Sequence, residues 1–191
     1  MFIDTDTIDH VPSNYIVIDI ETTGFSPCND SILEIAAAKF HNSFEVERFC
    51  QLVKSDCELS EAACKVNGIT YEMLSDASDV EQVLRDFIEF VGIYTIIAHN
   101  AAFDISFLQE KMSPFHMVLD NPVIDTLEMS RHRLPELSSH SLEFLKNYFC
   151  INSGTVHRAL PDVIATAEIF ERLCALPVSD ARPKQKRSTY A

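Results

Sequence analysis

Two carboxylates that flank a single apolar residue are the first side chains in this sequence whose types and spacing suit chemistry. Asp19 and Glu21 stand on either side of Ile20, at the end of the apolar run YIVIDI. On a β-strand, side chains two positions apart point to the same face. Neighbouring carboxylates repel unless a cation neutralises them, and Mg²⁺ and Mn²⁺ prefer such oxygen ligands. The pair indicates a divalent-metal site, but a D-x-E pattern alone is weak evidence and needs further ligands.

Two more acidic residues and a histidine stand where they can complete such a site. Asp104 lies in the first turn of a predicted helix that follows a short strand, and Asp162 follows Pro161 at the start of the last helix. Acidic residues are favoured at helix N-termini for the helix dipole alone, so neither is specific by itself. His157 precedes Asp162 by five residues. An imidazole with a pKa of about 6.5 suits a general base at neutral pH.

Apolar periodicity predicts the elements that must position these residues. Strands are predicted at residues 15–20, 32–40, 45–53, 95–98 and 122–124. Helices are predicted at residues 60–66, 80–91, 101–112, 141–149 and 161–173, with one more after residue 125. Asp125 or Thr126 is expected to cap that additional helix, and Asp125 is therefore not counted among the metal ligands. Three strands followed by strand–helix units predict an α/β fold with a mixed five-stranded central sheet flanked by helices.

Length and composition suit one compact domain. The chain has 191 residues, of which 47% are hydrophobic, enough for a single core. We expect an N-terminal leader at residues 1–14, a main domain at 15–176 and a flexible C-terminal tail at 177–191. No apolar run approaches the roughly 20 residues needed to span a bilayer, and no signal-peptide core is visible. We therefore expect a cytoplasmic protein with no membrane partner.

The charge balance and the cysteine spacing argue against two kinds of functional site. The 15 basic and 29 acidic residues give 15 − 29 = −14. This argues against a protein that tracks nucleic acid through a basic surface, but it permits a nuclease that reaches phosphate through divalent cations. The six cysteines form no CxxC pair, so free thiols are expected rather than a zinc site.

Taken together, the ordered motifs resemble the DEDDh (DnaQ-like) family of 3′→5′ exonucleases. The resemblance is strongest to the proofreading exonucleases of bacterial replicative polymerases, of the DNA polymerase III type. It covers roughly residues 15–173 and is carried by the segments DIETTG at 19–24, ILEIA at 32–36, NGIT at 67–70, AHNAAFD at 98–104, VIDTL at 123–127 and HRALPD at 157–162.

This resemblance implies a ribonuclease H-like fold and hydrolysis of the terminal phosphodiester with two divalent cations, Mg²⁺ or Mn²⁺. Asp19 would contact both ions, Glu21 and Asp162 would complete the first position, and Asp104 would support the second. His157 would accept the proton of the attacking water. The residues implied for binding the 3′-terminal nucleotide are Thr22, Thr23, Phe25, Asn67, His99 and Phe103, and a core role for Phe103 is equally compatible with its sequence.

The resemblance leaves the substrate open. Single-stranded DNA or frayed DNA 3′ ends, in proofreading or repair, are favoured over an alternative in which the enzyme trims RNA or short oligoribonucleotides. A catalytically idle binding domain is a third reading, disfavoured because all five motif residues are present. Asn67 stands where proofreading subunits often have His, and the segment after Leu173 is short. The second departure leaves association with a polymerase uncertain.

Overall fold

The structure is a computed structural model of the chain and describes residues 1–8, 10–55, 67–152 and 158–177. The predicted helix at 60–66, the candidate base His157 and nearly all of the C-terminal tail lie outside the described residues.

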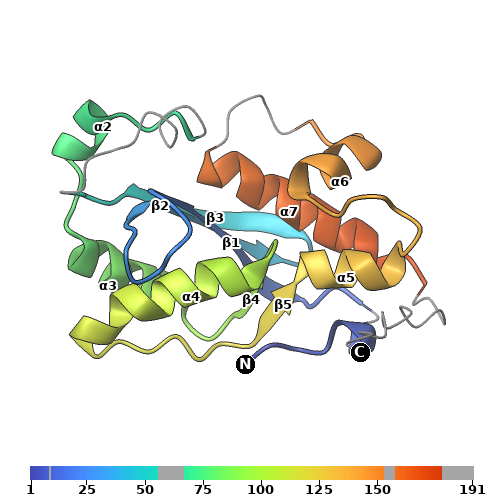
Figure 1. Cartoon of the computed structure of the whole chain (residues 1–191). Coiled ribbons are helices and arrows are strands. Elements are labelled where there is room, and N and C mark those ends of the chain that lie inside the picture. The colour runs from blue at the N-terminus through green and yellow to red at the C-terminus, as the bar shows by residue number, and fades with distance from the viewer. Residues whose placement is uncertain (9, 56–66, 153–157, 178–191) are drawn as a thin grey trace, which may run out of the picture.

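A five-stranded mixed sheet with the order β3-β2-β1-β4-β5 forms the centre of the molecule (Figure 1). The strands are β1 (Asn14–Thr22), β2 (Ile32–His41), β3 (Phe44–Leu52), β4 (Thr95–Ala98) and β5 (Val123–Asp125). β1 pairs antiparallel with β2, β2 pairs antiparallel with β3, and β4 lies parallel to both β1 and β5. The predicted mixed five-stranded sheet is confirmed, and each strand end lies within two residues of its predicted position.

The helices follow the sequence prediction closely, with one addition. They are α2 (Tyr71–Ser75), α3 (Val80–Val91), α4 (Ala101–Met112), α5 (Thr126–Arg133), α6 (Leu142–Tyr148) and α7 (Ala159–Cys174), with short 3₁₀ turns at η1 (Thr5–Thr7) and η2 (Ser113–Phe115). The five-residue α2 has no counterpart among the predicted helices, because it is too short to produce a periodic apolar pattern. α7 begins two residues earlier than predicted.

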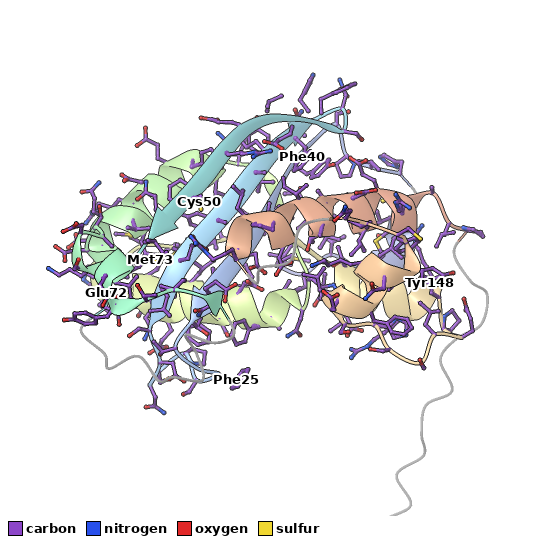
Figure 2. The ribbon with its side chains drawn as sticks, turned by 90° about the horizontal axis from the view of Figure 1, so that it is seen from above. Phe25, Phe40, Cys50, Glu72, Met73 and Tyr148 are labelled. Carbon is purple, nitrogen blue, oxygen red and sulfur yellow. The ribbon has the colours of Figure 1, made fainter. Side chains whose placement is uncertain are left out.

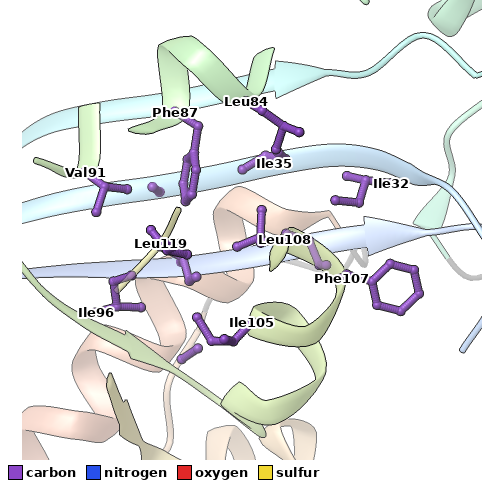
Figure 3. Packing of buried hydrophobic residues seen from close by; sticks show 14 of the residues in the cluster. Ile32, Ile35, Leu84, Phe87, Val91, Ile96, Ile105, Phe107, Leu108 and Leu119 are labelled. Carbon is purple, nitrogen blue, oxygen red and sulfur yellow. The ribbon is translucent and has the colours of Figure 1, made fainter. Parts of the chain in front are cut away.

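Alternation along β1 divides the core into two layers. Ile16, Ile18 and Ile20 face α3 and α4, where they pack with Phe87 and Leu108 (Figure 3). Tyr15 and Val17 point to the other face and pack against α5, α6 and α7. Figure 1 shows α7 lying across that second face. Because Asp19 and Glu21 continue the odd-numbered series, they point toward the face that α7 covers.

The first residues of the chain are attached to the sheet. The Ile3 amide donates to the Val123 carbonyl at 2.7 Å, and the Val123 amide donates to the Met1 carbonyl at 3.0 Å. Buried Arg133 donates to the carbonyls of Ile8 and Leu173, which ties this segment to the end of α7. Met1 and Ile3 are therefore held against β5 by backbone hydrogen bonds, and Ile8 is held by the Arg133 side chain. No helix in the described part of the chain is long and apolar enough to cross a membrane.

Candidate active site

Three carboxylates meet where the end of β1 approaches the start of α7. Asp19 and Glu21 lie on β1, and Asp162 lies in the first turn of α7. One oxygen from each lies within 4.8 Å of the other two. A strand end and a helix start that are 141 residues apart in sequence, counted from Glu21 to Asp162, thus supply one site. This grouping agrees with the first metal position implied by the motifs.

Asp104 adjoins this group from the opposite side. Its carboxylate is 3% exposed and accepts a hydrogen bond from the Ile20 amide at 3.2 Å. α4 is set in place by Asn100, which adopts a left-handed conformation before it, and by Asp125, whose carboxylate accepts hydrogen bonds from the Asn100 and Ala101 amides. Asp104 is therefore fixed next to Asp19 but is not one of the three clustered ligands.

Asp125 has a structural role. Besides its bonds to the start of α4, it accepts a hydrogen bond from the Leu127 amide at 2.8 Å and caps α5. One side chain at the end of β5 therefore satisfies amides at the start of two helices. The prediction that Asp125 caps its helix is confirmed.

Burial and mutual repulsion make the anionic forms of these carboxyls unfavourable. Burial, followed by repulsion from Asp104 and Glu21, raises the pKa of Asp19 well above its usual range. Burial also raises the pKa of Glu21 to about 7, with repulsion from Asp162 and Glu34 adding to the shift. For Asp104, burial raises the pKa to about 8. Bound cations would supply the missing positive charge.

The residues present fit divalent cations with hard oxygen preference. Carboxylate oxygens from Asp19, Glu21 and Asp162 are close enough to share one ion, and Mg²⁺ or Mn²⁺ typically binds through a few carboxylates plus water. Asp104, beside Asp19, is placed to support a neighbouring position.

Glu34 and Arg158 form an ion pair next to the cluster that the motif analysis did not assign. Glu34 lies opposite Glu21 in the β1–β2 register and is 1% exposed. Its carboxylate accepts from the Arg158 guanidinium through two nitrogens, one at 3.0 Å, and from the Ala159 amide at 3.2 Å. The pair thereby anchors the start of α7. A glutamate inside the otherwise apolar run ILEIA was the available signal, but nothing in the sequence named its partner.

Lys146 also approaches the cluster. Its ammonium lies 3.3 Å from Oδ1 of Asp162, and both side chains are largely buried, at 12% and 13% exposed. No local pattern predicts this contact, because Lys146 lies on α6 and Asp162 on α7.

Thr22, the last residue of β1, and Thr23 and Phe25 of the loop that follows belong to an ordered turn, and all three are predicted substrate-binding residues. Asp30 accepts hydrogen bonds from the Thr23 hydroxyl at 3.3 Å and from the Ser26 amide at 2.8 Å. The Thr22 hydroxyl donates to the Gly24 carbonyl at 2.6 Å. A Cβ at Gly24 would meet the Asp30 carboxylate at 2.6 Å, so a larger residue there would displace the side chain that holds the turn. Phe25 projects from this loop and is 91% exposed (Figure 2).

The other predicted substrate-binding residues are only partly brought together. Phe103 stacks edge-on with Phe25, with ring centroids 6.4 Å apart, and also contacts Phe107 in the core. Both a surface role and a core role for Phe103 are therefore supported. Asn67 is buried, and its side chain accepts from the Ile69 amide at 3.0 Å, which holds the segment that follows.

His99 lies in a different environment. Its Nδ1 is 2.9 Å from the Thr126 hydroxyl, and burial lowers its pKa to about 4, so the ring is neutral. It lines a cavity of about 540 Å³ together with Asn100, Arg131 and residues 138–142. His99 precedes Asn100, the N-cap of α4, so it lies near the start of the helix that carries Asp104. None of the residues that line its cavity belongs to the β1–β2 loop.

Comparison with known proteins decides the family. The RNase T exonuclease model matches residues 16–170. The chain belongs to this exonuclease family. PolC-type DNA polymerase III from Caldanaerobacter subterraneus subsp. tengcongensis is 40% identical over 159 residues, and that from Bacillus subtilis is 40% identical over 161 residues. Each alignment covers 83% of this chain but 11% of the polymerase, so the chain corresponds to a small part of these relatives.

Solved structures of exonucleases share the fold. Exonuclease X, in complex with 5′ overhanging duplex DNA, matches with a TM-score of 0.68 and 26% identity, covering 84% of this chain and 91% of that one. Exonuclease I matches with a TM-score of 0.73 and 21% identity, covering 86% of this chain and 43% of that one. The expected ribonuclease H-like fold and exonuclease family are confirmed.

Proposed function

We propose that this chain is a 3′→5′ exonuclease that releases nucleoside 5′-monophosphates from single-stranded or frayed DNA ends with two divalent cations, Mg²⁺ or Mn²⁺. The observation that carries the proposal is the cluster of Asp19, Glu21 and Asp162, whose oxygens lie within 4.8 Å. Keeping three half-buried carboxylates this close together is costly unless cations neutralise them. Membership of the exonuclease family indicates that such a site hydrolyses the terminal phosphodiester of a nucleic acid.

Each side chain then has a defined task. Asp19, Glu21 and Asp162 would hold one cation, and Asp104 together with Asp19 would support the second. Cations held by these carboxylates would orient the scissile phosphate and neutralise the charge that develops on it. His157 is proposed to accept the proton of the attacking water, a role that rests on the HRALPD motif because this residue is outside the described structure.

The loop after β1 is proposed to hold the 3′-terminal nucleotide. Thr22 and Thr23 lie directly after the metal-ligand pair, in a turn fixed by Asp30. Phe25 offers an exposed aromatic face on which a base can stack. Asn67, Phe103 and His99 are proposed as further contacts to the terminal nucleotide.

DNA is proposed over RNA as the substrate. The two PolC-type relatives are DNA polymerases by name, and the matched exonuclease X was solved with DNA. We propose a role in proofreading or repair, with a polymerase as the partner. The acidic net charge of −14 predicts frequent dissociation between cleavage steps.

A side-by-side digestion tests the proposal. Single-stranded DNA and RNA of one sequence, labelled at the 5′ end, are incubated with the chain and Mg²⁺ or Mn²⁺. We expect a ladder of single-nucleotide steps on DNA, slower attack on RNA, and no reaction at a 3′-phosphate. Asp162→Asn should abolish the ladder, whereas Asp120→Asn, at an exposed position outside the cluster, should leave it unchanged.

Three results would contradict parts of the proposal. Faster digestion of RNA would assign the chain to RNA trimming. Rapid cleavage of circular single-stranded DNA would exclude an exonuclease, since a circle has no terminus. Binding of DNA without hydrolysis under any metal condition would indicate the idle binding domain.

A further inference from the structure

Lys146 is the one cation that forms an ion pair with the Asp19–Glu21–Asp162 cluster within the described structure. Its Nζ lies 3.3 Å from Oδ1 of Asp162 and 3.3 Å from Oε2 of Glu143. Arg158 forms its ion pair with Glu34 and acts on Glu21 only through its charge. The Lys146 ammonium therefore already contacts Oδ1 of Asp162, a residue that is proposed to bind a metal ion.

The fold holds Lys146 in this position from both ends of α6. The Ser141 hydroxyl caps the helix by accepting from the Phe144 amide at 3.3 Å. Leu145, directly before Lys146, is fully buried in the core that α6 shares with α7. At the other end, the Phe149 carbonyl accepts a hydrogen bond from Arg172 of α7 at 2.7 Å. The ammonium is thus presented to Asp162 by packing rather than by a flexible surface chain.

We propose that Lys146 is a positioning residue that acts through Asp162 to weaken the hold of this site on a divalent cation. The inference rests on the proposed function. A metal ion at the cluster must share Asp162 with the ammonium and lies a few ångströms from a like charge. Because Lys146 is only 12% exposed, water and salt screen that repulsion weakly. Lys146 keeps the bound ion exchangeable, and it partly neutralises the acidic cluster when no ion is bound.

If Lys146 only orients Asp162, removing it should change the metal affinity in the opposite direction. Loss of an orienting hydrogen bond to a metal ligand typically weakens metal affinity 10- to 100-fold. Loss of a repelling charge strengthens it. The sign of the change therefore decides between the two roles, and stability alone would not.

Titration of the full chain with Mn²⁺, in the absence of DNA, measures this sign. We expect the Mn²⁺ dissociation constant of Lys146→Met to fall on the order of tenfold. Lys146→Arg, which keeps the charge, should stay within about threefold of the wild type. Lys39→Met is the matched control, because Lys39 is similarly buried at 16% exposed, pairs with Glu47 at 2.8 Å and lies over the Phe90 ring, on the α3 side of the sheet.

A second neutral variant and two further measurements show whether a change in affinity comes from the lost charge or from misfolding. Lys146→Gln provides a second neutral variant, and melting in EDTA shows whether each variant is folded. In the nuclease assay, the Mn²⁺ concentration for half-maximal rate should fall in parallel with the dissociation constant.

An unchanged or raised Mn²⁺ dissociation constant in both neutral variants would overturn the inference about Lys146. Mn²⁺ binding and nuclease activity of the wild type would still support the proposed function in that case. Loss of binding in Asp162→Asn identifies the cluster as the titrated position. Absence of Mn²⁺ binding in the wild type would overturn both proposals.

Discussion

The buried Glu34 and the half-buried pair Asp19 and Glu21 lie side by side at one end of the sheet and differ in whether a positive charge of the chain neutralises them. Glu34 and Glu21 are direct partners across β2 and β1. Glu34 is bound by the Arg158 guanidinium and the Ala159 amide. Glu21 and its neighbour Asp19 have no such partners among the described residues, and their pKa values are raised. Glu34 thus has its counter-charge within the chain, whereas the charge of Arg158 offsets only part of the upward pKa shift of Glu21.

This difference separates a structural role from a functional one. Burying a charge costs several kcal/mol unless a partner compensates it. The Glu34–Arg158 pair meets that requirement and fixes the start of α7. The Asp19–Glu21 pair leaves it unmet, which a folded protein tolerates at a site where a ligand supplies the compensation. The Glu34–Arg158 pair therefore positions Asp162, and the Asp19–Glu21 pair is where cations would bind.

The largest expected effect comes from removing one charge of the Asp19–Glu21 pair. Asp19→Asn should lower the nuclease rate by about 10³-fold or more, since a lost metal position forfeits several kcal/mol of transition-state stabilisation. Melting in EDTA should show unchanged or higher thermal stability, because repulsion from Asp104 and Glu21 is relieved. A variant with wild-type activity would contradict the metal model.

Removing the charge of Glu34 should instead lower the stability of the folded chain. Glu34→Gln removes the negative charge that Arg158 pairs with, and we expect the free energy of unfolding to fall by about 1–3 kcal/mol, because the 31% exposed guanidinium is partly screened by water. Urea denaturation measures this loss. The double variant Glu34→Gln/Arg158→Gln should recover part of the stability, since no unpaired charge remains. Equal stability of Glu34→Gln and the wild type would show that the two pairs do not differ as described.

The pH dependence of stability sharpens the contrast. Glu21 has a folded pKa of about 7 against an ordinary value of 4.5. A raised carboxyl pKa means that the folded state holds the proton more tightly, so the stability it contributes is present below about pH 4.5 and is lost as the pH rises through about 7. In EDTA, Glu21→Gln should therefore gain stability relative to the wild type between pH 5 and pH 8.

The control for this comparison is Glu110→Gln, at an exposed position, which should show no such trend. Adding Mg²⁺ or Mn²⁺ at pH 8 should stabilise the wild type more than Glu21→Gln. A stability difference that is independent of pH would indicate that Glu21 is ionised throughout.

The smallest expected effect belongs to a residue outside both pairs. Phe25→Ala removes the exposed ring that is proposed to stack on the terminal base, an interaction worth about 1–3 kcal/mol. We expect KM for single-stranded DNA to rise roughly tenfold, with little change in kcat. Thermal stability should stay within about 0.5 kcal/mol, because the side chain is 91% exposed. A fall in kcat alone would assign Phe25 to positioning rather than binding.

The sequence by itself determined the elements and the chemistry-bearing side chains. Alternation along residues 15–21 placed Asp19 and Glu21 on one face of a strand. Asp125 at the end of a strand predicted a helix cap, which the Leu127 amide confirms. These features depend on neighbours within a few residues, so a local pattern is enough to predict them.

Tertiary structure alone decided which charges are met and which are not. Glu34 and Arg158 are 124 positions apart, and Lys146 reaches Asp162 from another helix. α7 begins before Pro161 because the Ala159 amide is held by Glu34, a contact with no local signature. No periodicity records which distant side chains share a buried space, because burial depends on how the sheet and helices pack.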